Sequence, residues 1–208
     1  MKSITKFTNA LMEKYLPDPY IFVVILTLGV VIMGVALTDS SPLDMAIYWG
    51  DGFWQLLAFT MQMVVVLAAG HVLAHSPLFQ KLLEKLASKI KTPGAAIVIV
   101  TFVSLLACWI NWGFGLVIGA LFAKQIAKTV RGVDYRLLIA SAYSGFVIWH
   151  GGLAGSIPLS LATKDHPFEK ITGIIPTTDT IFTPYNMFIV LVILFALPIF
   201  NRIMMPKP

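Results

Sequence analysis

The chain has 208 residues, of which 58% are hydrophobic and only 12% are charged, whereas soluble domains average about 45 to 50% apolar and about 25% charged residues. A water-soluble protein of this size cannot bury so much apolar surface. The composition therefore predicts a membrane protein and excludes a soluble enzyme, a disordered regulator and a disulfide scaffold. The net charge of +5 comes from basic residues in short connectors between apolar runs. We interpret it as a topology signal and expect no nucleic-acid partner.

The first third of the chain contains two apolar runs that are long enough to cross a bilayer. Residues 20–37 carry no charged side chain, and about 18 residues at 1.5 Å each cover most of a hydrocarbon layer about 30 Å thick. Residues 53–73 form the second run. The connector between the runs holds three aspartates and no Lys or Arg. The positive-inside rule therefore places this connector outside the membrane and residues 1–19 on the cytoplasmic side, at the membrane interface.

Residues 75–92 combine basic residues with leucines at helical spacing. Four lysines stand against a single acidic residue, Glu84. This pattern predicts an amphipathic helix that lies in the plane of the membrane interface, with its lysines among the lipid headgroups. The same charge rule places this helix on the cytoplasmic side.

Residues 94–123 form an apolar stretch that is longer than one transmembrane span needs but too short for two full spans. The two halves, residues 94–108 and 112–122, are about 15 and about 11 residues long and meet at a polar tip that begins at Asn111. Undersized helices that meet at such a tip predict a re-entrant hairpin, which enters the membrane and returns to the same side. Two full spans would give the same charge pattern and are the alternative.

The last third of the chain contains an interrupted run and a final span. Residues 137–163 are overlong for one span, and three glycines and a proline within residues 150–158 must break the helix. Residues 164–186 are polar and hold three prolines, so we predict an external loop. Residues 187–200 form the last predicted span. The chain is thus predicted to be an all-α, polytopic membrane protein with about four to six transmembrane helices in a single domain, residues 1–208.

The two interruptions are the candidate binding features. A broken helix exposes amide N–H groups that attract an anion and carbonyl oxygens that suit Na⁺ or protonated water. The candidate substrate-binding residues gather at these two places and are Asn111, Gly113, Ser144, His150, Gly151, Gly152, Gly155 and Ser156. The glycines have an alternative role, because small residues four positions apart also let membrane helices pack closely. His150 has a structural alternative as a hydrogen-bonded residue.

The same residues predict no catalytic site, no metal site and no cofactor. Within the predicted spans the ionisable side chains, apart from Cys108 and the tyrosines, are His71 and His150. The paired carboxylates or the H-E-x-x-H pattern that an intramembrane enzyme would use do not occur there. We therefore expect a protein that is not an enzyme.

Two long strings of the sequence resemble the short-chain fatty acid transporter (AtoE) family of bacteria. They are N-W-G-F-G-L-V-I-G-A from Asn111 and A-Y-S-G-F-V-I-W-H-G-G-L-A-G-S-I-P from Ala142, and the later segment 178–182 is also similar. The resemblance covers nearly the whole chain. It implies a carrier for small monocarboxylates such as acetoacetate or butyrate, within the ion transporter superfamily, whose members use inverted repeats with re-entrant hairpins and broken helices. It also implies that Asn111 and residues 144–156 lie where substrate and coupling-ion groups belong.

The resemblance departs from the family in length. Family members are about twice as long, and this chain resembles their amino-terminal half. The resemblance therefore implies one half of an inverted-repeat symporter in the bacterial inner membrane, with Na⁺ or H⁺ as the coupling ion. Such a half would work with a separate second half or as a homodimer. The alternative is a truncated, non-transporting membrane protein or interaction subunit that retains only the fold.

Overall fold

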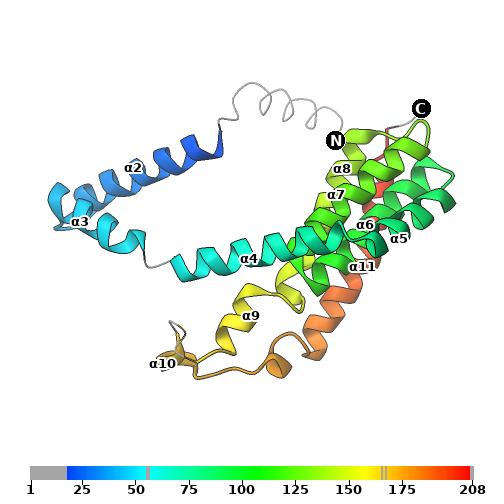
Figure 1. Ribbon diagram of the computed structural model, residues 1–208. Coiled ribbons are helices and arrows are strands. Elements are labelled where there is room, and N and C mark those ends of the chain that lie inside the picture. The colour runs from blue at the N-terminus through cyan, green and yellow to red at the C-terminus, as the bar shows by residue number, and fades with distance from the viewer. Residues whose placement is uncertain (1–17, 55–56, 165, 167, 207–208) are drawn as a thin grey trace. The chain divides into compact units, whose positions relative to one another are not determined.

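The structure, a computed structural model, describes residues 18–54, 57–164, 166 and 168–206 (Figure 1). Within these residues every regular element is helical, which confirms the predicted fold class. The chain divides into two units, residues 1–61 and residues 62–208. The predicted interfacial segment, residues 1–19, lies outside the described residues except for its last two positions.

The first unit contains α2, Pro19–Leu37, whose start is fixed by residues at its amino terminus. The Asp18 carboxylate accepts a hydrogen bond from the backbone N–H of Tyr20 at 2.8 Å, and Pro19 occupies the first turn, where its missing N–H costs nothing. None of the described α2 residues is buried within the protein. A helix that is apolar all round and uncovered by protein is suited to a lipid environment.

The acidic connector of the first unit is itself a helix, α3, Pro42–Phe53. The Ser41 hydroxyl accepts from the backbone N–H of Asp44 at 3.2 Å, and the Asp44 carboxylate accepts from the backbone N–H of Ser41 at 2.8 Å. This reciprocal capping box satisfies two amide groups that the helix itself leaves unbonded. The hydrogen bonds from the Ser41 hydroxyl and N–H also hold the pKa of the Asp44 carboxyl below its usual value.

The second unit has a core of closely packed helices. Its elements are α4, Leu57–Ala74, which begins in the first unit, followed by α5, Pro77–Lys89, α6, Pro93–Ile110, α7, Trp112–Thr129, and α8, Tyr135–Ser144. The largest fully buried side chains of this core are Ile97, Phe122, Ile126 and Leu138. α6 packs against α7, α8 and the later α11, Pro184–Ile203, so it is the central helix of this unit.

The run expected to form a broken helix does break. α8 passes directly into a 3₁₀ helix, η1, Gly145–Gly151, and a turn leads to α9, Ser156–Leu161. The following segment contains α10, Glu169–Thr172, and a short 3₁₀ turn, η2, Thr177–Asp179, before α11 begins. The described part of the predicted loop, residues 164–186, therefore contains only short helices before α11 begins at Pro184.

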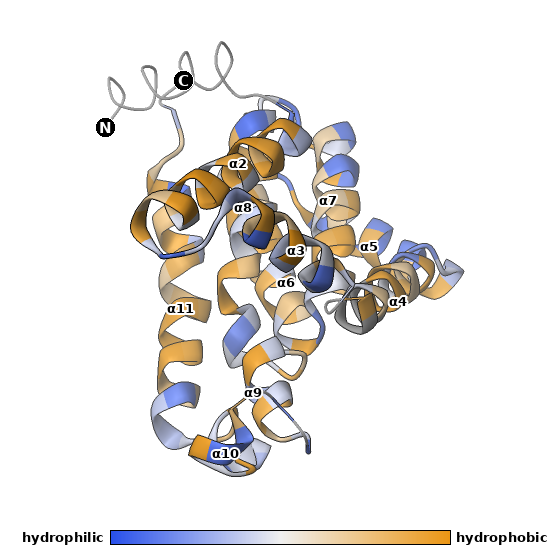
Figure 2. Ribbon diagram, turned by 90° about the vertical axis from the view of Figure 1, so that its left-hand side faces the viewer, coloured by the Kyte–Doolittle hydropathy of each residue, from blue (hydrophilic) through white to orange (hydrophobic). Residues whose placement is uncertain are grey.

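Four stretches of the described residues are long and apolar enough to cross a membrane: α2, α6, the α8–η1–α9 run Tyr135–Leu161, and α11. The apolar residues extend along most of α2 and α11 in Figure 2. The protein is therefore a polytopic membrane protein. Among the described residues, α4 contributes a shorter apolar stretch, Val64–Ala74.

The hairpin formed by α6 and α7 is longer than the apolar runs indicated. Each arm has 18 residues, about 27 Å at 1.5 Å per residue, instead of about 15 and 11. α7 is longer because it continues through Lys124 to Thr129 as an amphipathic helix. The re-entrant path of this hairpin stays a prediction.

Candidate functional site

Asn111 alone joins the two arms of the hairpin. Its backbone N–H donates to the Ala107 carbonyl at 2.9 Å and ends α6, while its carbonyl accepts from the Gly115 N–H at 2.8 Å and begins α7. Its side-chain Oδ1 accepts from the Phe114 N–H at 3.0 Å. Asn111 thus caps α7 with its one side-chain acceptor. In the described part of the chain the Nδ2 amino group has no hydrogen-bond partner, so it is available as a donor.

The glycines beside the tip permit close helix contacts. A Cβ atom added to Gly115 would lie 2.6 Å from the Cα of Cys108, and one added to Gly119 would lie 2.9 Å from the Ser104 hydroxyl. Both positions face α6. Gly113 is buried beside Val66 of α4. The alternative role of the glycines, close packing, therefore applies at Gly115 and Gly119.

The broken helix is tied to the hairpin tip through the carbonyl of Gly151. This oxygen accepts from Trp109 Nε1 and from Asn186 Nδ2, each at 3.1 Å. In return the backbone N–H of Leu153 donates to the Trp109 carbonyl at 2.7 Å. Three segments that are far apart in sequence, namely the end of α6, the break and the start of α11, are therefore held together by hydrogen bonds.

Gly152 and Gly155 are both buried at this junction. A Cβ at Gly152 would lie 2.8 Å from the Cα of Trp109, so only glycine fits without a backbone shift. The Gly155 N–H donates to the Gly152 carbonyl at 3.0 Å, which closes the turn, and Ser156 begins α9. α9 has only six residues, so its helix dipole is small. α7 is longer, so its amino terminus carries the larger partial positive charge at this site.

His150 lies on an aromatic surface. Its ring stacks on Trp149 with the centroids 4.1 Å apart, and Trp149 in turn contacts Trp112 of α7 at 5.2 Å. Trp149 is held in place because its Nε1 donates to the Ala154 carbonyl at 3.1 Å. His150 itself is exposed. The side of the α7 amino terminus that faces the break is therefore lined by aromatic rings.

Ser144 belongs to a different polar group, inside the helix bundle. Its hydroxyl donates to the Ser141 carbonyl at 2.8 Å and accepts from Asn201 Nδ2 at 2.9 Å. Asn201 also donates to the Thr101 hydroxyl at 3.1 Å. Asn201 and Asn186 lie about 15 residues apart on α11, or about 22 Å along its axis. The structure thus links Gly151 and Gly152 to the hairpin tip and engages the Ser144 hydroxyl elsewhere.

Three residues with central contacts were not among the predicted site residues: Trp109, Asn186 and Asn201. Each carries a polar group within or next to an apolar run, where an unpaired donor is costly. Asn201 lies on the last turns of the final span and Asn186 at its start. A polar side chain within or next to an apolar run is the sequence signal that could identify these residues.

Comparisons with known proteins identify what the chain resembles as a whole. A family model described as short chain fatty acid transporter matches residues 1–208. A protein of Escherichia coli (strain K12) is 48% identical over 205 residues, and one of Haemophilus influenzae (strain ATCC 51907 / DSM 11121 / KW20 / Rd) is 47% identical over 211 residues. Both carry the provisional name short-chain fatty acid transporter.

The alignments cover nearly all of this chain, 99% and 98% of it, but only 47% of each relative. The chain therefore spans about half the length of the curated relatives it matches. No solved structure shows significant similarity.

Proposed function

Because the chain belongs to the short-chain fatty acid transporter family, we propose that it is a secondary transporter, or one half of one, for short-chain fatty acids and similar small monocarboxylates such as acetoacetate or butyrate. The observation that carries this proposal is the junction of the hairpin tip with the broken helix. It combines a free amide donor, the start of a long helix and an aromatic surface within one unit.

The carboxylate is proposed to bind at the amino terminus of α7. The Nδ2 group of Asn111 donates to one carboxylate oxygen, and the first amide N–H groups of α7 add their partial positive charge. Gly113 lets the start of α7 pack closely against Val66 of α4, which fixes the position of these N–H groups. A carboxylate stripped of water needs such donors, because an unpaired charge is costly in a membrane.

The short acyl chain is proposed to lie on the aromatic surface of Trp112 and Trp149, with His150 at its edge. Aromatic rings offer apolar contact area at a small entropic cost. A substrate with two to four carbons needs only a small apolar surface. This division of the site, with donors at one end and rings at the other, selects a small monocarboxylate over an inorganic anion.

The remaining parts of the transport mechanism follow from the design of inverted-repeat carriers. The site would lie between two halves and be exposed to each face of the membrane in turn. The second half would be a separate polypeptide or another copy of this chain, and Na⁺ or H⁺ would be the coupling ion. We place the protein in the inner membrane of bacteria, as a symporter that passes through the membrane several times.

Uptake of labelled butyrate into proteoliposomes tests this proposal. Two preparations are compared: the chain alone, and the chain together with the part of the Escherichia coli relative that lies outside the matched region. We expect uptake above that of protein-free liposomes in at least one preparation, with inhibition by unlabelled acetoacetate and none by butyramide, which lacks the charge. Absence of uptake in both preparations would overturn the proposal and favour the non-transporting alternative.

A further inference from the structure

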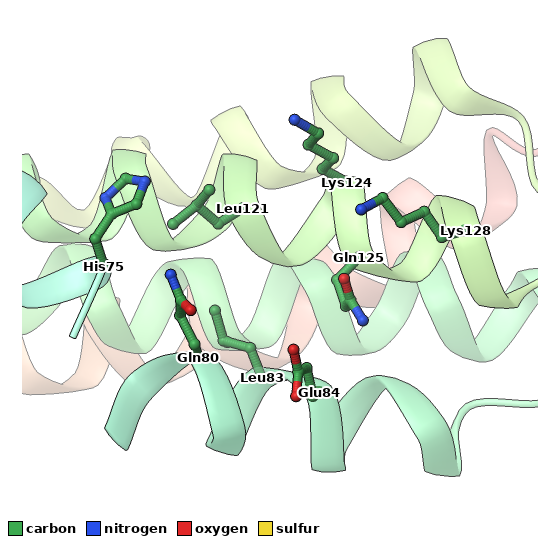
Figure 3. Close-up of a pocket in the computed structure, with 8 residues that line it drawn as sticks. All are labelled: His75, Gln80, Leu83, Glu84, Leu121, Lys124, Gln125 and Lys128. Carbon is green, nitrogen blue, oxygen red and sulfur yellow. The ribbon is translucent and has the colours of Figure 1, made fainter. Parts of the chain in front are cut away.

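A hollow of about 260 Å³ lies between α5 and α7, apart from the junction described above (Figure 3). α7 contributes Lys124, Gln125 and Lys128, and α5 contributes Gln80 and Glu84. Leu83 and Leu121 supply the apolar part of the lining. The hollow is thus polar and positively charged over an apolar base.

The two lysines are the dominant charges of this hollow. Lys124 and Lys128 are four positions apart on α7, so they lie on one face of that helix. In the part of the chain that the structure describes, neither is in an ion pair, although Glu84 lines the same hollow. Two positive charges against one negative charge leave a net attraction for an anion. Lysine ammonium groups bind phosphate as point charges.

The position of α5 sets the level of this hollow in the membrane. α5 buries Leu83 and Ala87 against the bundle and leaves Lys81, Lys85 and Lys89 exposed. A helix with one apolar and one basic face lies at the membrane interface, with its lysines at the level of the headgroups. A hollow bordered by such a helix would be within reach of lipid phosphates in a polytopic protein.

We propose that this hollow binds the phosphodiester headgroup of an anionic phospholipid of the phosphatidylglycerol class. Lys124 and Lys128 hold the phosphate. Gln80, Glu84 and Gln125 supply the hydrogen-bonding groups that the glycerol hydroxyls require. A hollow of about 260 Å³ is at the small end of ligand pockets, which begin at about 300 Å³. It accommodates a headgroup and leaves the acyl chains in the bilayer.

Lipid binding to the full chain, purified in detergent, tests this site. The affinity for phosphatidylglycerol in mixed micelles is measured for the wild type and for Lys124→Gln/Lys128→Gln, with phosphatidylcholine as the reference lipid. The matched control is Lys81→Gln/Lys85→Gln, which removes two charges from exposed positions of α5 outside the hollow. We expect a loss of about tenfold or more for the first variant and less than about threefold for the control.

The charge-preserving variant Lys124→Arg/Lys128→Arg keeps the test independent of folding, and we expect it to retain phosphatidylglycerol binding. Equal losses in the hollow and control variants would show diffuse attraction and overturn the proposal, as would no loss in either. Inorganic phosphate is titrated into the same samples. Saturation of the hollow by phosphate at lower concentrations than by lipid would make free phosphate the occupant and overturn the lipid assignment.

Discussion

Replacing Gly115 with alanine is expected to destabilise the protein, although alanine is the better helix former. The added Cβ would lie 2.6 Å from the Cα of Cys108, and that backbone atom cannot move aside as the end of a flexible side chain can. Overpacking of this kind costs about 1 to 3 kcal/mol, and most of that range exceeds the gain of about 1 kcal/mol in helix propensity. The thermal midpoint of the detergent-purified protein should fall by several degrees.

Gly29 provides the matched control for this prediction. It is also a helix glycine, but a Cβ added there meets no atom within 4 Å. Gly29→Ala should leave the thermal midpoint unchanged or raise it. If Gly115→Ala behaved like Gly29→Ala, the close contact between α6 and α7 would not exist as described.

Replacing Asn111 with alanine is expected to give a large loss of transport. A hydrogen bond to a charged group contributes about 1.5 to 3 kcal/mol, so loss of the Nδ2 donor should weaken butyrate binding about tenfold or more. Asn111→Ala also removes the side-chain acceptor that caps α7 at the backbone N–H of Phe114. Loss of such a cap costs about 0.5 to 2 kcal/mol of stability. The measurement is the concentration dependence of butyrate uptake, normalised to folded protein.

Asn111→Asp separates the two roles of this residue. Aspartate keeps the acceptor that caps α7 and is an equally good cap, so stability should be retained. It removes the amide donor and adds a negative charge opposite the substrate carboxylate, so uptake should fall at least as far as in Asn111→Ala. Normal uptake by Asn111→Asp would limit Asn111 to a structural role.

The helical elements could be predicted from the sequence because each depends on local pattern. The α6–α7 turn at Asn111 and the break after α8 follow from residue types whose effect on a helix is immediate, such as the glycines at 151, 152 and 155. α3 was missed, although its capping box is visible in the sequence as Ser41 followed by Asp44 three residues later. The acidic residues indicate an external connector but do not specify its secondary structure.

The contacts between elements could not be predicted, because they depend on how the helices pack. The hydrogen bond between Ser144 and Asn201 joins residues 57 positions apart, and the one between Trp109 and Gly151 joins residues 42 positions apart. No local pattern specifies either pair. For the same reason the sequence grouped Ser144 with the break, while the packed structure directs its hydroxyl into the bundle.

Substrate protection of a single cysteine at position 150 tests most directly whether the junction is the carboxylate site. His150→Cys is made in a Cys108→Ala background, and its reaction with a maleimide is followed in the proteoliposomes used for uptake. The control is Ser88→Cys on α5, which is also exposed. We predict that saturating butyrate slows labelling at position 150 several-fold, with no effect at position 88 and no effect of butyramide. Equal labelling rates at position 150 with and without butyrate would contradict a carboxylate site at the junction.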